Sequence, residues 1–409
     1  MAECISNNKS RDFYKEVKKL KSGGNVSNCV NGETDPHKIA MLFAKKYQDL
    51  YNSVPSDGQH LDYIRSQLEE DLSSSAASDA VISKSMVEKA IRNLKLNKRD
   101  AKNELLSNHI VYGSDILLKL LSVLLTAILM HGFYPERIRL ATILSIPKDP
   151  KGDMGDENNY RGIAMLSSIA KIFDHVFLLR NESKLLTSEL QFSFKENHGT
   201  TMCSMMLKET IRHYLQNGSN VVSCFIDSSK AFDLVRHDKL FDLMQKRQIP
   251  AMDIRAMLNV YSKLGTEWMG KHSPTFISTN GIRQGGIASP VFYCLYVDEL
   301  IGRLEREGTG CWIGKHYFGT FGYADDLTLL CPTFAGMQKM LKICETYANE
   351  YGVKFNPTKS KCMLFSKQRK SIVMSEVRLN GLKLDWTTTM KHLGNYISAD
   401  LSEEVEIQQ

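Results

Sequence analysis

The sequence predicts an α+β protein, from its size and from a change in the spacing of its apolar residues. The chain has 409 residues, 43% of them apolar, which is enough for two or three units that each have a core. Apolar residues recur at helical spacing in the first third, whereas later segments contain short apolar runs typical of strands. Because these strands mix with helices without regular β-α alternation, they favour an α+β architecture.

In the first 80 residues, helical patches alternate with joints rich in Ser, Gly and Asn. The segment DPHKIAMLFAKKYQDLYNSV is one such patch, and Ser74 to Asp79 is the candidate linker to the next unit. We therefore expect an N-terminal helical extension or linker over residues 1–80.

Two more helices are expected before the first strand. SKSMVEKAIRNLKLNK carries apolar residues at helical spacing, with basic residues on the other face. The second helix, Ile116 to Met130, is followed by the stop signals Gly132 and Pro135. Its most apolar part, LLSVLLTAILM, is shorter than the roughly 20 residues that a membrane span needs, so we expect a buried helix.

Strand-like segments follow. IRLATILSIPK predicts a strand, NYRGIAMLSSIAKIFDHVF a turn that leads into a helix, and VVSCFID a buried strand followed by the helical HDKLFDLMQKR. Two further apolar arms flank Asp325 and predict a hairpin.

Charge and cysteine content indicate the surroundings of the chain. The 52 Lys and Arg against 46 Asp and Glu give a net charge of +6, which permits contact with nucleic acid without requiring it. The nine cysteines form neither a CxxC pair nor a zinc spacing, which is typical of core residues in a reducing compartment. The N-terminus lacks the apolar core of a secretory signal. We expect an intracellular protein, in the nucleus or cytoplasm, without a membrane partner.

Two adjacent carboxylates, Asp325 and Asp326, lie within the apolar segment TFGYADDLTLLCP. Two such charges repel each other at neutral pH unless a cation, a base or water neutralises them. An exposed hairpin turn, where Asp is common, is the alternative. The apolar and aromatic flanks favour a turn that is held on a packed sheet.

A third carboxylate, Asp227, ends the apolar run VVSCFID, so its side chain emerges at a strand terminus. Carboxylates from different segments can converge on Mg²⁺, which prefers oxygen ligands and retains water or substrate phosphate in its shell. Two such ions can activate a 3′-hydroxyl and neutralise a leaving pyrophosphate. The three carboxylates therefore point to nucleotidyl transfer, whereas Asp227 alone is equally consistent with a turn residue.

Between these carboxylates lies the glycine-rich segment GIRQGGIASPVFYCLYVDEL. Its glycines permit close backbone approach, Ser289 is a good N-cap and Pro290 suits a first helical turn. A helix from Val291 to Arg303 is expected. A loop with such a helix start can border a nucleotide and its template base, although glycine-rich turns also precede many helices that bind no ligand.

Three segments, SCFIDSSKAFDLVRHDKL, GIRQGGIASP and FGYADDLTLL, occur in this order. In this arrangement the chain resembles the reverse transcriptases of non-LTR (LINE-type) retrotransposons. The resemblance extends upstream to ILSIPKDPKGDMGDENNYRGIAMLSSIAKIFD and LQFSFKENHGTT, and downstream to VKFNPTKSKCMLF and KHLGNYIS. It covers roughly Val87 to Ser398.

The resemblance implies a right-hand polymerase with a fingers region at 81–220 and a palm at 221–400. The palm would carry the catalytic carboxylates and, in HLGNYIS, a segment like the primer grip. A short acidic tail would occupy 401–409. The implied activity is RNA-directed DNA polymerisation, with an RNA template, a DNA primer and deoxynucleoside triphosphates as partners and substrates.

It also implies roles for individual residues. Asp227, Asp325 and Asp326 would be the catalytic carboxylates that hold two Mg²⁺ ions, with Mn²⁺ as a substitute. The residues that would bind the nucleotide are Phe232 as the gate that excludes a ribose 2′-hydroxyl, Gln284 and Gly285 beside nucleotide and template, Lys148 and Arg161 on the triphosphate, and Lys359 near the pyrophosphate. Taken without the resemblance, Phe232 would be a core residue and Lys148 and Arg161 solvated surface charges.

The sequence also departs from the family pattern. Gly162 stands where Pro is usual, and Ser193 and Lys195 stand where Gly and Arg are usual. Only ADLSEEVEIQQ follows the grip-like segment, so the thumb is expected to be missing or severely truncated. Whether a protein partner supplies its function is left open.

Two other functions remain in view. One is an inactive retrotransposon-derived relic that folds and binds nucleic acid without polymerising. The other is a viral RNA-directed RNA polymerase, which shares palm carboxylates, but the bulky Phe232 argues against it because RNA synthesis must admit the 2′-hydroxyl.

Overall fold

The computed structural model of the chain describes residues 29–55, 57–74, 77–98, 105–261, 263–268, 271–367 and 372–402. Most of the expected tail and the centre of the expected linker lie outside these residues.

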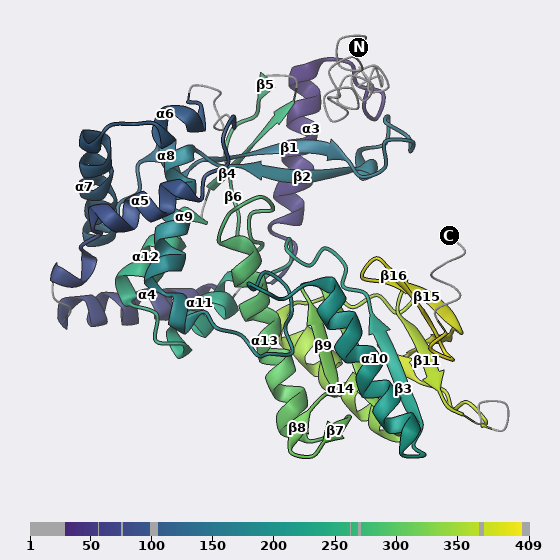
Figure 1. The fold of residues 1–409 in the computed structure, drawn as a ribbon. Helices are drawn as coiled ribbons and strands as arrows, with labels where there is room; N and C mark the ends of the chain where they lie inside the picture. The colour runs from purple at the N-terminus through teal and green to yellow at the C-terminus, as the bar shows by residue number, and fades with distance from the viewer. Residues whose placement is uncertain are drawn as a thin grey trace, which may run out of the picture.

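Two five-stranded sheets form the framework of the molecule (Figure 1). The first has the order β2-β1-β4-β5, with β6 also paired to β4, and the second has the order β14-β11-β3-β10-β9. The first sheet contains β1 (Ala141–Pro147), β2 (Tyr160–Met165), β4 (Lys263–Trp268), β5 (Lys271–His272) and β6 (Phe276–Ile277). The second contains β3 (Val221–Ile226), β9 (Thr320–Tyr323), β10 (Asp326–Cys331), β11 (Lys361–Phe365) and β14 (Asp385–Trp386).

Helices surround both sheets, and three short hairpins complete the described fold. The helices are α3 (Pro36–Leu50), α4 (Gly58–Ser74), α5 (Lys84–Arg92), α6 (Ser107–Val111), α7 (Asp115–His131), α8 (Glu136–Arg139), α9 (Ser168–Arg180), α10 (Thr200–Gln216), α11 (His237–Lys246), α12 (Ala251–Val260), α13 (Ser289–Glu307) and α14 (Phe334–Tyr351). The hairpins pair β7 (Trp312–Ile313) with β8 (His316–Tyr317), β12 (Arg378–Leu379) with β13 (Leu382–Lys383), and β15 (Thr389–His392) with β16 (Asn395–Ser398). This mixture of helices and strands agrees with the predicted α+β class.

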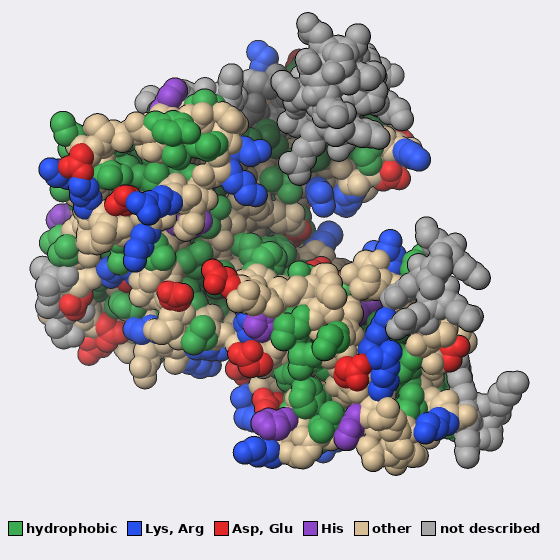
Figure 2. All heavy atoms as spheres, in the orientation of Figure 1, with side chains coloured by type: hydrophobic (Ala, Val, Ile, Leu, Met, Phe, Trp, Pro, Cys, Tyr) green, Lys and Arg blue, Asp and Glu red, His purple; other side chains and the backbone are tan. Residues whose placement is uncertain are grey.

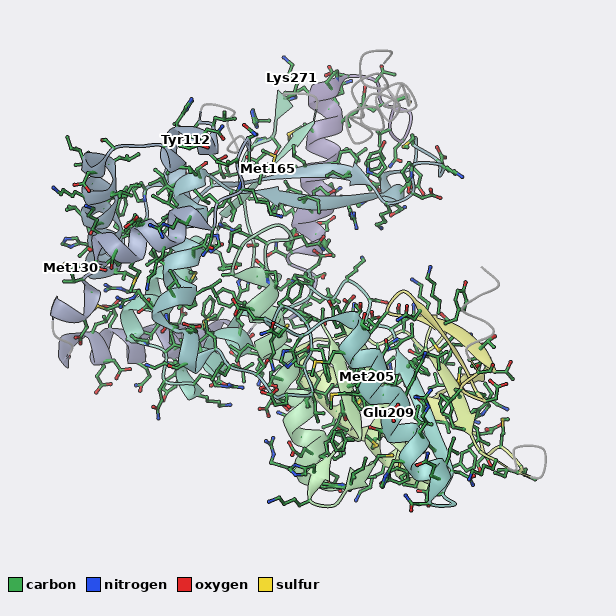
Figure 3. All side chains as sticks on the ribbon, in the orientation of Figure 1. Tyr112, Met130, Met165, Met205, Glu209 and Lys271 are labelled. Atoms are coloured by element: carbon green, nitrogen blue, oxygen red, sulfur yellow. The ribbon has the colours of Figure 1, made fainter. Side chains whose placement is uncertain are left out.

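The second sheet is covered on both faces. Along β3, Val222 and Cys224 join the core formed with α13 and α14, whereas Val221 and Phe225 join a core formed with α10. Alternate residues of a strand point to opposite faces, so a strand between two helical layers must be apolar throughout. The run VVSCFI meets this requirement, and each of its residues is buried. In Figure 3, the labelled Met205 and Glu209 mark the exposed side of α10.

The first sheet packs against α3. Asp35 caps this helix by accepting the N–H of His37 at 2.8 Å, and Pro36 occupies its first turn. Phe43 and Tyr47 on its buried face pack in one core with residues of β1 and β2, such as Ile143. The helix therefore covers one face of the first sheet.

Two local expectations, for residues 160–165 and for the start of α13, were wrong. Residues Tyr160–Met165 form β2 instead of a turn, because they pair antiparallel with β1. Ser289 is not the N-cap of α13: the helix begins at Ser289, and the buried carboxylate of Asp174 accepts the N–H groups of Ile287 and Ala288 at 3.1 and 3.3 Å. The N-cap position is taken by Ala288, whose side chain makes no cap hydrogen bond, and a side chain from α9 holds the loop just before the helix.

The helix expected to be buried, α7, is buried on one face only. Leu121, Leu125, Ile128 and Leu129 lie in the core, but Leu120 and Val123 are 62% and 68% exposed. Tyr112, just before the helix, and Met130 lie on the outer side of this helical region (Figure 3). Among the helices that the structure describes, none is both long enough and apolar enough to cross a membrane.

Candidate active site

A cleft of about 1080 Å³ lies between the two sheets. It is lined by all of the predicted site residues except Asp326: Lys148, Arg161, Asp227, Phe232, Gln284, Gly285, Asp325 and Lys359. Figure 2 shows the surface hollowed between the part of the molecule that contains the first sheet and the part that contains the second, with Lys and Arg side chains near its rim. Residues up to 211 positions apart in the chain, from Lys148 to Lys359, therefore meet in one site.

Asp227 follows the last residue of β3, and both of its backbone groups are held. Its N–H donates to the Ser360 hydroxyl at 3.1 Å, and its carbonyl accepts the N–H of Asn356 at 2.9 Å. The buried β3 brings Asp227 to the floor of the cleft, and the turn before β11 fixes its backbone there.

Asp325 lies in the tight turn between β9 and β10, where Tyr323 and Asp326 are cross-strand partners. The turn requires a left-handed backbone at Ala324, with φ +54°. The Ala324 N–H donates to the Ser193 hydroxyl at 2.8 Å and to Gln191 Oε1 at 3.3 Å. Two side chains from the segment before α10 thus hold the turn that presents Asp325.

The carboxylates influence one another. Desolvation by the surrounding cleft raises the pKa of Asp325, and the charge of Asp227 raises it further. The pKa of Asp326 is raised to about 6, first by desolvation and then by the charges of Asp325 and Asp227. Like charges disfavour ionisation of a neighbour, so this coupling indicates three carboxylates within one electrostatic site.

The donor set suits a hard cation, although the carboxylates are not fully converged. Asp227 and Asp325 offer carboxylate oxygens to the cleft, and none of the three carboxylates forms an ion pair among the residues that the structure describes. Within the same residues, no three His, Cys, Asp or Glu side chains are close enough together to form a ready-made metal site. Asp326, at the first position of β10, is outside the lining of the cleft.

Phe232 and the loop before α13 form one wall. The Phe232 ring stacks on Tyr293, with 4.8 Å between ring centroids, and its carbonyl accepts the Ile282 N–H at 2.8 Å. Gly285 has a φ of +105°, and a Cβ there would come within 2.8 Å of the Ala164 carbonyl oxygen. Glycine at 285 is therefore required for the loop to lie against β2.

The opposite wall is basic. Lys148 and Arg161 lie near facing ends of β1 and β2, and both side chains are exposed to the cleft. Lys148 Nζ donates to the Asn158 carbonyl at 2.9 Å, which holds its chain along the loop that joins these strands. Lys359 lies in the turn before β11, close in sequence to the residues that hold Asp227. The cleft thus has carboxylates on its floor and cations around them.

Sequence reasoning missed several lining residues. Lys46, Tyr47, Asp49, Leu50 and Ser53 come from α3 and the residues after it, and Lys230 and Asp233 flank Phe232. Asp233 directly follows Phe232, three residues after Lys230 within SSKAFD, and could have been suspected from that proximity. The α3 residues carried no sequence signal, because their position follows from the packing of the helix against the first sheet.

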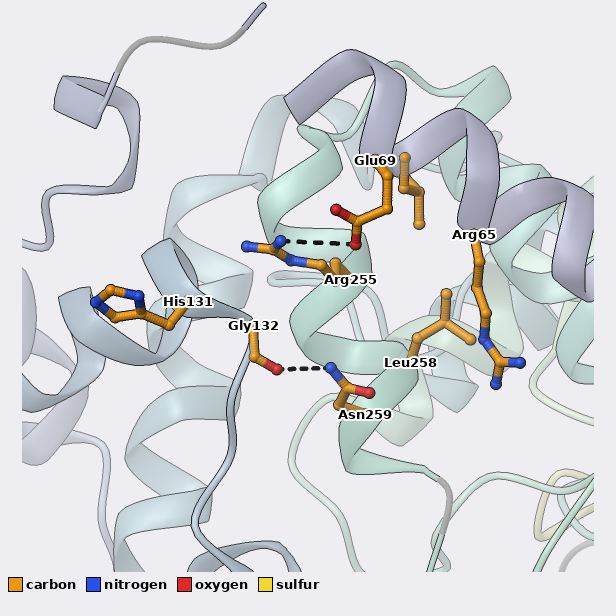
Figure 4. A pocket seen from close by; sticks show the side chains of 8 residues that line it. Arg65, Glu69, His131, Gly132, Arg255, Leu258 and Asn259 are labelled. Carbon is orange, nitrogen blue, oxygen red and sulfur yellow. Dashed lines mark hydrogen bonds and ion pairs between the residues drawn. The ribbon is translucent and has the colours of Figure 1, made fainter. Parts of the chain in front are cut away.

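A second hollow, of about 220 Å³, lies among α4, α7 and α12 (Figure 4). Arg255 donates to the Leu129 and Met130 carbonyls at 3.1 and 2.9 Å and lies 3.7 Å from the Glu69 carboxylate. Asn259 donates to the Gly132 carbonyl at 2.6 Å. These polar contacts join three helices, so this hollow is a structural junction.

Comparison with known proteins agrees with this site. The family model described as "Reverse transcriptase (RNA-dependent DNA polymerase)" matches residues 146–397. The chain belongs to the reverse transcriptase family. The matched region includes the second sheet, β2, and every predicted site residue.

The relatives of this reverse transcriptase come from non-LTR retrotransposons, which confirms the family resemblance. It is 27% identical over 255 residues to the "Retrovirus-related Pol polyprotein from type-2 retrotransposable element R2DM" of Drosophila melanogaster, covering 60% of this chain and 23% of that protein. It is 24% identical over 333 residues to the "RNA-directed DNA polymerase from mobile element jockey" of Drosophila funebris, covering 77% of this chain and 35% of that protein. The chain thus spans about a quarter to a third of the length of these relatives.

Proposed function

We propose that this reverse transcriptase is the RNA-directed DNA polymerase core of a non-LTR retrotransposon and adds deoxynucleotides to a primer 3′-hydroxyl. The observation that carries the proposal is the single cleft that collects Asp227, Asp325 and the predicted nucleotide-binding residues. Within it, carboxylates, a planar aromatic ring and several cations surround a space large enough for a nucleotide. Membership of the reverse transcriptase family supports the proposal.

In this proposal the carboxylates hold metal and the basic wall holds phosphate. Asp227, Asp325 and Asp326 are the ligands for two Mg²⁺ ions, which when bound supply activation of the attacking hydroxyl and charge neutralisation at the pyrophosphate. Arg161 offers a planar guanidinium for bidentate contact with phosphate oxygens, and Lys148 and Lys359 offer point charges. These cations offset the charge that builds up on the leaving pyrophosphate.

The remaining lining residues select the substrate. Phe232, fixed by stacking on Tyr293, occupies volume beside the sugar and excludes a 2′-hydroxyl. Gln284 and Gly285 border the nucleotide and its template base.

In the same proposal, the first sheet with α9 corresponds to the fingers of a right-hand polymerase, and the second sheet with α10, α13 and α14 corresponds to its palm. In this assignment β4, β5 and β6 join the fingers although they follow β3 in the chain.

The proposal is tested by extension of a DNA primer on an RNA template with the purified chain, in Mg²⁺ and separately in Mn²⁺. Template-directed incorporation of deoxynucleotides that is lost in Asp227→Asn is the expected result. Binding of primer-template without any extension in either metal would overturn the proposal and favour a relic that binds nucleic acid.

A further inference from the structure

A buried carboxylate, Asp233, lies in the cleft beside the proposed gate and accepts two hydrogen bonds. The Gln284 amide nitrogen donates to its Oδ1 at 2.9 Å, and the Tyr51 hydroxyl donates to the same oxygen at 3.1 Å. Asp233 is 8% exposed and Tyr51 is 3% exposed. Burial is the main cause that raises the pKa of Asp233 to about 6. A buried carboxylate with two donors is a fixed acceptor that constrains both partners.

This acceptor decides which way the Gln284 carboxamide is turned. An ionised carboxylate only accepts hydrogen bonds, so the amide group of Gln284 must direct its NH₂ toward Asp233. Its carbonyl oxygen, Oε1, then remains as the acceptor that Gln284 can offer to a ligand in the cleft. Without Asp233 the two ends of the carboxamide would be free to exchange places.

Tyr51 brings the end of α3 into the same network. Its hydroxyl contacts Asp233, and its carbonyl accepts the N–H groups of Thr279 and Asn280, both at 3.0 Å. The Asn280 side chain in turn donates to the Asp233 carbonyl at 2.7 Å. Tyr51 thus ties the loop that bears Gln284 to the segment that bears Phe232, although Tyr51 lies outside the residues matched by the family model.

We propose that Tyr51 and Asp233 are positioning residues for the incoming nucleotide: together they lock the Gln284 carboxamide so that its carbonyl oxygen accepts a hydrogen bond from that nucleotide. This inference rests on the proposed polymerase function and assigns a task to a helix that precedes the matched region. Through Asp233, the C-terminal end of α3 thus influences the affinity for the nucleotide.

The test compares the steady-state constants of Tyr51→Phe and Asp233→Asn for the deoxynucleotide. Tyr51→Phe removes one of the two donors to Asp233 Oδ1, so the carboxylate is held less firmly. Asp233→Asn keeps one oxygen that can accept both donors but removes the charge, which weakens the hydrogen bonds from Gln284 and Tyr51 that hold the carboxamide. Loss of one hydrogen bond to a charged group predicts that KM for the nucleotide rises roughly tenfold. We expect kcat to stay within about twofold, since neither residue holds metal or the reacting atoms.

Tyr347→Phe is the matched control, because it also removes a buried tyrosine hydroxyl, one that donates to the Tyr296 carbonyl at 2.7 Å outside the cleft. It should lower the melting temperature and leave KM unchanged. Because both positioning residues act through one contact, the Tyr51→Phe, Asp233→Asn double variant should raise KM less than the product of the single effects.

A KM equal to that of the wild type in both single variants, with lowered melting temperatures like the control, would overturn the inference while the polymerase assignment stands. If the wild type extends no primer, the proposed function fails on its own. In that case nucleotide binding is compared among the variants without polymerisation. The measurement is the rise in melting temperature that a deoxynucleoside triphosphate causes in the presence of Mg²⁺. A smaller rise in both variants than in the wild type and control supports the inference. An equal rise in all of these proteins, or no rise in the wild type, overturns it.

Discussion

The backbone N–H of Asp227 donates to the hydroxyl of Ser360 at 3.1 Å, and this contact joins the end of β3 to the turn before β11. The same hydroxyl donates to the Asn356 carbonyl at 2.7 Å. Ser360 is fully buried, so its hydroxyl faces these backbone groups and not solvent. Ser360 directly follows Lys359 in the chain. The residue that holds Asp227 on the acidic floor of the cleft is therefore adjacent to one of the cations that line it.

Ser360→Ala should therefore reduce primer extension more than it reduces stability. Losing the hydroxyl leaves the Asp227 N–H unpaired, which costs about 1 kcal/mol of unfolding free energy, and lets the carboxylate drift. We expect kcat to fall about tenfold, measured with saturating nucleotide. Ser223→Ala on β3 is the control, since the buried Ser223 hydroxyl has no partner among the described residues. Equal kcat in both variants would remove Ser360 from this role.

Asp227→Asn and Asp325→Asn should abolish extension while the melting temperature stays level or rises. Each change removes a proposed metal ligand and also relieves repulsion among the carboxylates, whose charges have no ion-pair partner among the described residues. Asp385→Asn on β14 removes a carboxylate paired with Lys361 at 2.7 Å in the same sheet, and should leave extension intact. The smallest effect is expected for Asp326→Asn, because Asp326 does not line the cleft. Full activity in Asp325→Asn would end the polymerase assignment.

Phe232→Val should raise the use of ribonucleotides relative to deoxynucleotides. The smaller side chain leaves space where the ring now stacks on Tyr293, so a 2′-hydroxyl is no longer excluded by volume. The measurement is the ratio of kcat/KM for the two nucleotide types on one template, which is independent of how much enzyme is active. An unchanged ratio in an active variant would show that the gate lies elsewhere.

Arg161→Ala should weaken nucleotide affinity with little effect on folding. The side chain is exposed to the cleft, and a charge-assisted phosphate contact is worth about 1.5 to 3 kcal/mol, so KM should rise at least tenfold. Arg378→Ala on β12 is the control, because this exposed arginine pairs with Glu376 at 2.8 Å away from the cleft. A fall in stability with unchanged KM would make Arg161 a structural residue.

Asp174→Asn should flatten the dependence of stability on pH. Burial raises the pKa of Asp174 from 3.8 to about 6 in the folded protein, so its protonated form favours folding. That contribution is fully present below pH 3.8 and is lost as pH rises through 6. Between pH 7.5 and pH 5 the wild type should gain about 1 kcal/mol from this group, which the variant should not. The Asn oxygen can still accept the N–H groups before α13. Unfolding in denaturant at the two pH values measures the difference, and identical slopes in both proteins would contradict it.

The sequence by itself determined the chemistry of the floor of the cleft. VVSCFID predicted a buried strand with a carboxylate at its end, and the apolar arms around Asp325 predicted a hairpin, because a strand packed on both faces must be apolar along its length. Both are found, as β3 followed by Asp227 and as β9 and β10 around Asp325. The order of these segments also predicted the family.

Only the tertiary structure decided how the walls are built. The strand β2 was taken for a turn, since its pairing with β1 depends on a partner that periodicity does not reveal. Ala288, whose side chain makes no cap hydrogen bond, holds the N-cap position expected for Ser289, and α7 keeps one apolar face exposed. Tyr51, Asp233 and Gln284 meet across 233 residues of chain, from 51 to 284. Local pattern encodes which face of an element is apolar, whereas contacts between distant elements depend on how those faces pack, and packing is a property of the whole fold.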